Sequence, residues 1–208
     1  RCGTRSRKIM DTALSKRRES LLRALTTRHG RKNSGFCMVE GLRCVNEILT
    51  LRPDLIDCCI LREDMADRVN SPDGKTVVLA KQPDFLPADA PLTDPFALLL
   101  DRVADPGNFG TIISTARAVG LHEIWVVKGG VDPFGDKAVR SASSAQFAVG
   151  IRLTDSLDEA VAALGKLGVR RFFRTEPAEG HSVFTEPELF TDSAIVLGNE
   201  ANGAGPVE

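Results

Sequence analysis

The chain has 208 residues, of which 42% are hydrophobic, and its 27 Lys and Arg against 28 Asp and Glu give a formal net charge of −1. This length and apolar content support a proper core in one large or two small domains. No apolar run approaches the roughly 20 residues that span a bilayer, and no apolar segment follows the basic start. We therefore expect no membrane span and no signal peptide in this sequence, which favours a cytoplasmic protein.

The charge is divided unevenly along the chain. Residues 1–52 hold 13 Lys and Arg against four Asp and Glu, a net +9, and the remaining residues carry −10. Such an asymmetry favours a polyanionic partner, above all nucleic acid, for the front of the molecule. The alternative is the solvated face of an ordinary amphipathic helix, because residues 14–25 combine Lys and Arg with spaced leucines.

The first third of the chain has the pattern of a small α/β unit followed by a linker. The expected elements are a helix at 14–25, a basic turn at 29–35, a strand at 36–39, a helix at 40–49, strands at 55–61 and 76–79, and a helix-like stretch at 63–69. Residues 81–94 are rich in proline and lack periodicity, which is typical of a linker. The five cysteines show no CxxC or Cys/His ligand spacing, so we expect reduced thiols and no metal site.

Strands and helices alternate in the rest of the chain, which predicts a parallel sheet of the α/β class. The expected strands are at 95–100, 123–127, 147–153, 169–175 and 194–197, and the expected helices at 109–119 and 157–167. The helix at 109–119 is expected to bury Ile112, Ile113, Ala116 and Val119. Trp125 is expected in the core rather than on a base-stacking surface, and the absence of tyrosine disfavours readout by stacking.

The turn at 105–108, DPGN, joins a strand to a helix and therefore lies where open α/β sheets bind ligands. A purely structural loop is the simplest interpretation of its spacing. A dinucleotide fingerprint is excluded, because no GxGxxG can be placed on Gly107 and Gly110. A phosphate-binding loop at 198–205, GNEANGAG, is disfavoured because it lacks the Lys-Ser/Thr of that motif.

Two motifs together make the pattern specific. Residues 105–120, DPGNFGTIISTARAVG, resemble the first motif of the SpoU family of RNA 2′-O-methyltransferases, approximately DPxNxGxxxRTAxxxG. Residues 196–203, VLGNEANG, resemble that family's second motif, an apolar strand that leads into GxExxG. Between them, DPF at 132–134 and KAVRS at 137–141 resemble family segments. FCMVEGLRCVNEIL at 36–49 resembles the opening of the small substrate-binding domain that precedes the catalytic domain in many members.

The resemblance implies methyl transfer from S-adenosylmethionine to a ribose 2′-hydroxyl of ribosomal or transfer RNA, by a protein that works as a homodimer. Asn108 matches the residue that positions the ribose and phosphate, and Glu200 matches the carboxylate that organises the site. Arg31, Lys32 and Arg140 are the candidates for contact with RNA phosphate, although a surface arginine on a helix is the simpler interpretation of Arg140 alone.

The resemblance also implies the cofactor pocket. Gly198, which Leu197 precedes, matches the glycine that lets the backbone approach S-adenosylmethionine. Thr175 and Glu176 end the preceding strand and are further candidates for this pocket. No metal ligand is expected.

Two departures from the family pattern put catalysis in question. Ser114 stands where the family has an arginine that binds phosphate and helps to activate the hydroxyl, and serine supplies neither a fixed charge nor a bidentate fork. Arg117 lies about one helical turn away. The sequence also stops at Glu208, before the family's third motif. From this we expect a fragment that lacks the family's trefoil knot, binds the cofactor weakly and exposes an apolar sheet edge.

The sequence as a whole predicts a SPOUT-type parallel-sheet methyltransferase domain at 93–208, knotted in intact relatives. A small basic RNA-binding α/β domain with its linker is predicted at 1–92. The competing hypothesis is a non-catalytic RNA-binding relative, which Ser114 supports and which Asn108 and Glu200 argue against.

Overall fold

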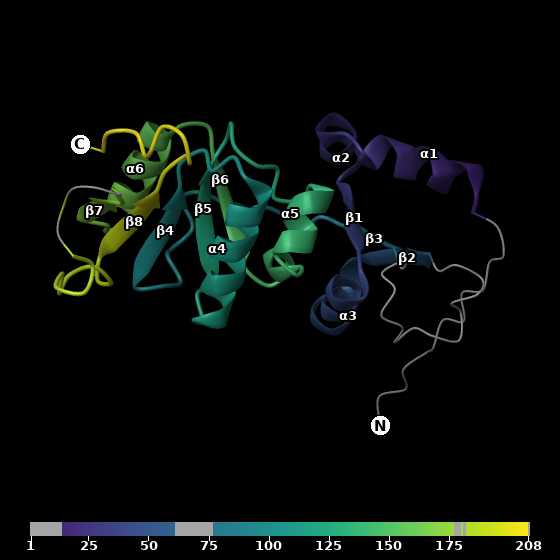
Figure 1. Cartoon of the computed structure of the whole chain (residues 1–208), viewed down its shortest axis with the longest axis horizontal. Coiled ribbons are helices and arrows are strands. Elements are labelled where there is room, and N and C mark those ends of the chain that lie inside the picture. The colour runs from purple at the N-terminus through teal and green to yellow at the C-terminus, as the bar shows by residue number, and fades with distance from the viewer. Residues whose placement is uncertain (1–13, 61–76, 177–179, 181, 208) are drawn as a thin grey trace, which may run out of the picture.

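The computed structural model describes residues 14–60, 77–176, 180 and 182–207, and these form two sheets with their covering helices (Figure 1). The smaller sheet has the order β1-β3-β2 and is antiparallel. The larger sheet has the order β6-β5-β4-β8-β7 and is parallel throughout. Among the described residues, no helix is long and apolar enough to cross a membrane.

The smaller sheet and its helices come from residues on the N-terminal side of the proline-rich segment. The elements are α1 (Lys16–Leu25), α2 (Arg28–Ser34), β1 (Phe36–Glu40), α3 (Leu42–Leu51), a short 3-10 helix (Pro53–Leu55), β2 (Ile56–Ile60) and β3 (Val77–Lys81). The helix-like stretch expected at 63–69 lies outside the described residues.

The basic turn expected at 29–35 is wrong, because these residues belong to helix α2. The hydroxyl of Thr27 accepts a hydrogen bond from the backbone N–H of Gly30 and caps the start of the helix. Gly35 adopts φ 70° and ends the helix in the left-handed conformation that glycine tolerates. The charged composition of residues 28–34 does not indicate a helix, but the caps at Thr27 and Gly35 specify where the helix begins and ends.

The larger sheet alternates strands and helices as expected. Its elements are β4 (Phe96–Leu100), α4 (Pro106–Ala118), β5 (Glu123–Val127), α5 (Asp136–Ser141), a 3-10 helix (Ala145–Phe147), β6 (Gly150–Thr154), α6 (Leu157–Lys166), β7 (Arg171–Arg174) and β8 (Ser193–Leu197). Helix α4 begins three residues before the expected start because Asp105 caps it and Pro106 occupies the first turn. Val119 is 69% exposed rather than buried, because the helix has ended and turned at that point.

The order of the strands brings the two motif loops together. The chain runs from β4 outward to β5 and β6, and then returns through β7 to place β8 on the other side of β4. Leu99 pairs with Val196, and Leu100 pairs with Leu197, so β4 and β8 end at the same level. In open α/β sheets such a reversal of strand order creates a crevice at the carboxyl ends of the two strands.

Both faces of the larger sheet are buried. Leu100, Ile124 and Val126 face the cluster that contains residues of α4 and α5, whereas Leu99 and Trp125 face the cluster around α6. The first cluster continues into the smaller sheet, where its members are Cys37, Val39, Cys44, Val45, Ile48, Val78 and Ala80. One hydrophobic core therefore joins the two sheets.

Arg152 fastens the proline-rich segment to the larger sheet. Its guanidinium pairs with Glu123 at 2.7 Å and donates to the carbonyls of Pro87, Ala90 and Pro91 at 2.6 to 2.8 Å. Arg152 is only 1% exposed and lies over the ring of Trp125. This part of the linker follows a defined path along the sheet.

Candidate active site

The carboxylate of Glu200 binds the loop that follows β4. Its Oε2 accepts a hydrogen bond from the N–H of Ala104 at 3.0 Å, and its Oε1 accepts one from the N–H of Asp105 at 3.1 Å. Oε1 also accepts from Nδ2 of Asn108 at 3.0 Å. The second motif thus holds the first motif through three donors, at the start of helix α4.

These donors lower the pKa of Glu200 to about 2. Desolvation, which raises the pKa, is outweighed by the hydrogen bonds from Ala104, Asn108 and Asp105. The carboxylate is therefore ionised throughout the neutral range, and its proton affinity is too low for a general base. Glu200 is chemically suited to hold the loop in place.

The orientation of the Asn108 side chain follows from the charge on Glu200. An ionised carboxylate only accepts hydrogen bonds, so the amide nitrogen of Asn108 must face it. The amide oxygen of Asn108 is then directed away from Glu200, as an acceptor at the exposed start of α4. Asp105 fixes the backbone beneath it by accepting from the N–H of Asn108 at 2.8 Å.

The turn at 198–204 leaves no room for a side chain at Gly198. An added Cβ at Gly198 would lie 1.9 Å from the backbone nitrogen of Ala204 and 2.1 Å from the carbonyl carbon of Gly203. The turn is closed by two hydrogen bonds between Asn199 and Gly203, at 3.0 and 2.8 Å. Asn199 also donates to the carbonyl of Arg102 at 3.0 Å, which ties this turn to the loop after β4.

Ser114 lies apart from Asn108 and Glu200. It is six residues beyond Asn108, or about 9 Å along the axis of the helix, and its hydroxyl donates to the carbonyl of Thr111. Ser114 lines a polar pocket of about 450 Å³ between α3, α4 and α5. In that pocket Arg117 donates to Glu47 of α3 at 3.0 Å. Arg117, the arginine of α4 nearest to Ser114, is therefore directed toward α3.

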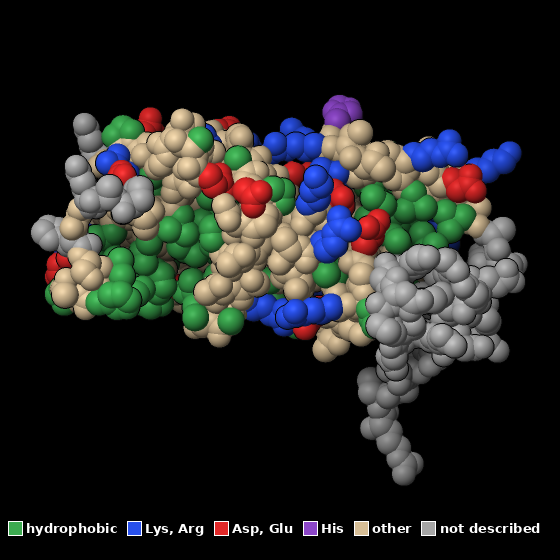
Figure 2. Space-filling model, in the orientation of Figure 1, with side chains coloured by type: hydrophobic (Ala, Val, Ile, Leu, Met, Phe, Trp, Pro, Cys, Tyr) green, Lys and Arg blue, Asp and Glu red, His purple; other side chains and the backbone are tan. Residues whose placement is uncertain are grey.

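Arg140 lies beside the first motif. With Lys137, one turn earlier on α5, it lines a hollow of about 410 Å³ against Asp105, Pro106 and Gly107. The side chain of Arg140 is 55% exposed and lies near Asp136 at 3.6 Å. On the face in Figure 2, Lys and Arg gather over α1, α2 and α5, and hydrophobic side chains form patches toward the β7 and β8 end and below α1.

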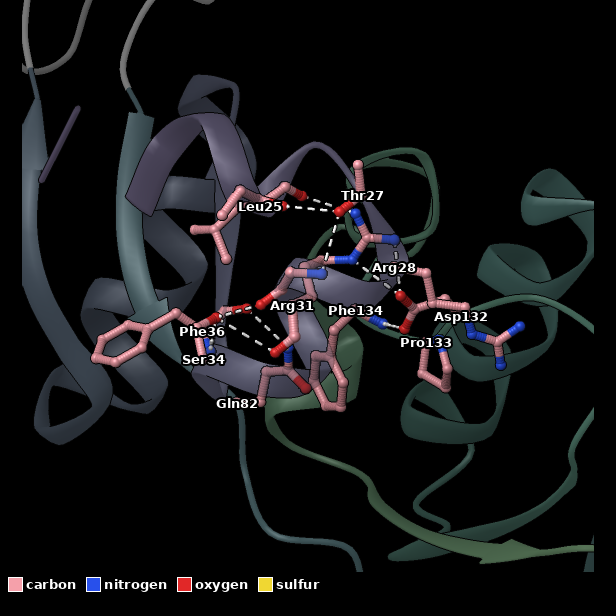
Figure 3. A network of polar contacts seen from close by, with 12 residues as sticks. Leu25, Thr27, Arg28, Arg31, Ser34, Phe36, Gln82, Asp132, Pro133 and Phe134 are labelled. Atoms are coloured by element: carbon pink, nitrogen blue, oxygen red, sulfur yellow. Dashed lines mark hydrogen bonds and ion pairs between the residues drawn. The ribbon is translucent and has the colours of Figure 1, made fainter. Parts of the chain in front are cut away.

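Arg31 does not have the exposed position that a phosphate contact needs. Its guanidinium pairs with Asp132 at 2.7 Å and donates to the carbonyl of Leu25 at 2.7 Å, with the side chain 9% exposed (Figure 3). Gln82 supports the same junction by donating to the carbonyl of Phe36 at 2.7 Å. The arginine holds α2 against the loop after β5, whereas its neighbour Lys32 is exposed.

Comparisons with known proteins agree with this geometry. Residues 95–207 match the SpoU rRNA Methylase family, which is more than half of the chain. The chain belongs to the SpoU rRNA methylase family. The expected resemblance and the α/β fold with a parallel sheet are confirmed.

Relatives of the SpoU family match both sequence and structure. The 23S rRNA (guanosine(2553)-2′-O)-methyltransferase RlmP of Bacillus subtilis is 31% identical over 148 residues, which are 71% of this chain and 58% of that protein. A protein of the TrmH family from Porphyromonas gingivalis superposes with a TM-score of 0.76 at 25% identity, over 93% of this chain and 84% of that one. The AdoMet-bound rRNA methyltransferase of Sinorhizobium meliloti has a TM-score of 0.75 at 25% identity, over 93% and 82%. The chain spans about half the length of the curated relatives it matches.

The remaining candidates of this SpoU chain lie at the ends of β7 and β8. Thr175 donates from its hydroxyl to the carbonyl of Val196 at 3.1 Å, beside Leu197. Glu176 pairs with Arg174 at 2.9 Å. The structure therefore keeps Thr175 and Leu197 together at the carboxyl edge of the sheet, while the carboxylate of Glu176 is engaged by its neighbour.

Two cations at this edge of the sheet, Lys137 and Arg102, are not among the site residues predicted from the sequence. Lys137 lies within the KAVRS segment, three residues before Arg140, and the helical spacing was a usable signal. Arg102 follows β4, is 52% exposed and forms a bidentate pair with buried Asp101 at 2.8 and 3.0 Å. Its φ of 55° is unusual for a non-glycine residue, and no sequence signal marks it.

Proposed function

We propose that this chain carries the catalytic site of an S-adenosylmethionine-dependent RNA methyltransferase that modifies a ribose 2′-hydroxyl in ribosomal or transfer RNA. The observation that carries the proposal is the contact between Glu200 and Asn108, which joins the two family motifs at the switch point of the sheet. The match to the SpoU family and the named activity of RlmP support the same assignment. In this proposal residues 93–208 form the methyltransferase domain and residues 1–92 the RNA-binding domain.

The chemistry of the β7 and β8 ends fits a cofactor that is held by backbone groups and apolar surface. The space that a Cβ would fill at Gly198 is occupied by the backbone of Gly203 and Ala204, so a tight turn forms one wall there. Leu197 and Thr175 stand beside it. We assign Leu197, Gly198 and Thr175 to the cofactor pocket, and Glu176 to its outer edge. S-adenosylmethionine, when bound, would supply an electrophilic methyl group to the ribose oxygen and leave as S-adenosylhomocysteine, while the hydroxyl proton passes to solvent.

The protein's own contribution is to position the hydroxyl. The amide oxygen of Asn108 is turned away from Glu200 and accepts a hydrogen bond from the ribose 2′-hydroxyl. This contact orients a lone pair of the hydroxyl oxygen toward the methyl group. Glu200 is a positioning residue, because its contacts are with the loop and its pKa is far below that of an effective base. Arg140, with Lys137, and Lys32 on α2 are the proposed contacts for RNA phosphate.

One observation favours a second function. Ser114 provides no fixed charge, and Arg117 is paired with Glu47 instead of facing Asn108. A relative that binds RNA without methylating it fits this arrangement. We retain methyl transfer as the conclusion because Asn108, Glu200 and the turn at Gly198 are all in place. The cytoplasmic location and the homodimer implied by the family resemblance remain part of the proposal, and sedimentation analysis tests the latter.

Transfer of tritium from labelled S-adenosylmethionine to bulk ribosomal and transfer RNA tests the proposed function. The label should appear in alkali-resistant dinucleotides, because a 2′-O-methyl group blocks cleavage of the neighbouring phosphodiester. Asn108→Ala should lower the rate about a hundredfold or more, while Asn46→Ala, a matched change on the exposed face of α3, should not. Absence of label with retained RNA binding would establish the non-catalytic alternative.

A further inference from the structure

A separate pocket lies at the junction of the two sheets. We call it the junction pocket; it encloses about 330 Å³, which is within the size range of small-molecule sites. Its lining includes residues from α2, the linker, the loop after β5 and the end of β6, namely Arg28, Lys32, Phe85, Lys128, Pro133 and Leu153. None of these residues contacts Asn108 or Glu200 in the interactions of the described chain.

The rim of the junction pocket is positively charged. Arg28 and Lys32 are exposed on α2, and Nη1 of Arg28 lies 3.5 Å from the carbonyl of Gly130. Lys128 is half exposed on the opposite side, where it pairs with the exposed Asp155. The one acidic residue of the lining, Asp132, is neutralised by its buried contact with Arg31. The pocket therefore presents an excess of cations, which suits an anionic ligand.

The pocket also has a supported aromatic face. Phe85 is 41% exposed, and its ring lies 6.1 Å from the ring of buried Phe134. Phe134 in turn packs against Phe147 at 5.8 Å, within the core that joins the two sheets. One side of the Phe85 ring is thus held against rigid structure, and Figure 3 shows Phe134 beside Gln82 and Pro133 at this junction. A backed aromatic ring is a favourable platform for a flat ring system.

The junction pocket is directly connected to the loop of the first motif. Val131 donates to the carbonyl of Val103 at 2.8 Å. Gly130 packs so closely that a Cβ would lie 2.2 Å from the same carbonyl oxygen. Lys128 follows β5 at the edge of the sheet where β4 and β8 also end. Asn108 and the junction pocket therefore lie along the same edge of the sheet.

From the ring, the cations and this continuity we propose that the junction pocket binds one unstacked nucleotide of a single-stranded RNA segment adjacent to the modified ribose. The base stacks on Phe85, and the phosphates on either side contact Arg28, Lys32 and Lys128. The inference rests on the proposed RNA substrate and deepens it, because it assigns single-stranded rather than duplex RNA to this surface. It reverses the expectation from the absence of tyrosine, since phenylalanine supplies the stacking face.

Fluorescence anisotropy with a labelled single-stranded RNA of about 12 nucleotides, and with the blunt duplex of the same sequence, tests the proposal on the full chain. Phe85→Ala should weaken single-strand binding about fivefold to a hundredfold, the range for loss of one base stack. Phe85→Leu should weaken it similarly, because leucine keeps the apolar packing on Phe134 without an aromatic face. Thermal melts by circular dichroism confirm folding of each variant. The matched control is Phe190→Ala, which removes another exposed phenylalanine near the far end of the larger sheet.

The salt dependence of RNA affinity tests the charged rim of the junction pocket separately. Arg28→Ala with Lys32→Ala should reduce the slope of log affinity against log salt by about 0.7 for each lost phosphate contact, whereas Phe85→Leu should leave the slope unchanged. Equal affinity of wild type, Phe85→Leu and Phe190→Ala for the single strand would overturn the junction pocket while leaving methyl transfer intact. Equal losses on single-stranded and duplex RNA would overturn it as well. Failure of the wild type to bind the single strand would overturn the junction pocket, and the tritium-transfer assay decides methyl transfer separately.

Discussion

Oε1 of Glu200 accepts a hydrogen bond from Nδ2 of Asn108 at 3.0 Å, across 92 residues of sequence. This contact fixes which end of the Asn108 amide faces outward, because an ionised carboxylate has no proton to donate. The same carboxylate holds the N–H groups of Ala104 and Asp105. The order of the motif loop thus depends on the charge of one side chain.

The Glu200 contact should make stability depend on acid in a defined window. The pKa of Glu200 is about 2 in the folded protein, against 4.5 ordinarily. A lowered pKa contributes stability above about pH 4.5, and that contribution is lost as the pH falls toward 2. Glu200→Gln should cost about 1 kcal/mol at pH 7, given the exposure of the site.

Urea denaturation at pH 7, 4 and 3 measures this effect, and the difference between wild type and Glu200→Gln should shrink at each step. Asp84→Asn, which changes an exposed carboxylate of the linker, provides the control. A difference that stays constant over this pH range would show that the carboxylate charge does not hold the loop.

Gly110 should resist even the smallest enlargement. A Cβ there would lie 2.3 Å from Oγ of Ser141 and 2.5 Å from its carbonyl carbon, so Gly110→Ala must separate α4 from α5. We expect a loss of about 1–3 kcal/mol in the free energy of unfolding. Gly165→Ala is the matched control: nothing lies within 4 Å of its added Cβ on helix α6, and it should stabilise by about 0.5 kcal/mol. Equal effects of the two substitutions in urea titrations would contradict the close packing at α5.

Arg31 should be worth far more to stability than an exposed arginine. Arg31→Ala leaves Asp132 partly buried without its partner and should lower the free energy of unfolding by about 3 kcal/mol. Arg52→Ala removes a pair with Asp54, whose side chain is 61% exposed, and should cost less than about 1 kcal/mol. Chemical denaturation compares the two. If Arg31→Ala instead preserved stability and only weakened RNA binding, the sequence-based role of Arg31 would be correct after all.

Ser114→Arg should raise methyl transfer if the family arginine acts through charge. The side chain of residue 114 lines the polar pocket of about 450 Å³, where Glu47 is already paired with Arg117 and the added guanidinium would supply an uncompensated charge. We expect a gain of about tenfold or more in the rate with tritiated cofactor. Ser114→Lys tests the bidentate fork and should give a smaller gain. Identical rates for all three side chains would mean that this position has no part in catalysis.

The placement of the motifs could be predicted, because it follows from strand order and chain direction. Asn108 and Glu200 each follow an apolar strand, and parallel neighbours end at one edge, so their approach is encoded in the pattern. The role of Arg31 could not be predicted in this way. Its burial depends on Asp132, which lies 101 residues away, and a basic sequence such as RHGRKNS suits an exposed turn equally well.

The exposure of Val119 and the existence of the junction pocket could not be predicted from the sequence either. Val119 fits the periodicity of a buried helix face but lies just past the last residue of α4. The junction pocket combines α2, the linker and the loop after β5, and no local pattern specifies that three such segments meet. Phe85 lies in the proline-rich linker, where the local sequence predicts no fixed structure. Its ring has a defined position because it packs near Phe134 of the core.

The anchoring of the linker by Arg152 has a consequence for how a substrate is captured. A flexible tether would let the small sheet search for RNA independently and would raise its effective concentration near the site. Here the carbonyls of Pro87, Ala90 and Pro91 are fixed to the sheet, so the distance from α2 to Asn108 is set when the chain folds. The entropic cost of ordering the linker is met when the chain folds, and binding does not have to meet it again. For the RNA substrate proposed above, this fixed distance favours segments whose contacts to α2 and to Asn108 are already the same distance apart.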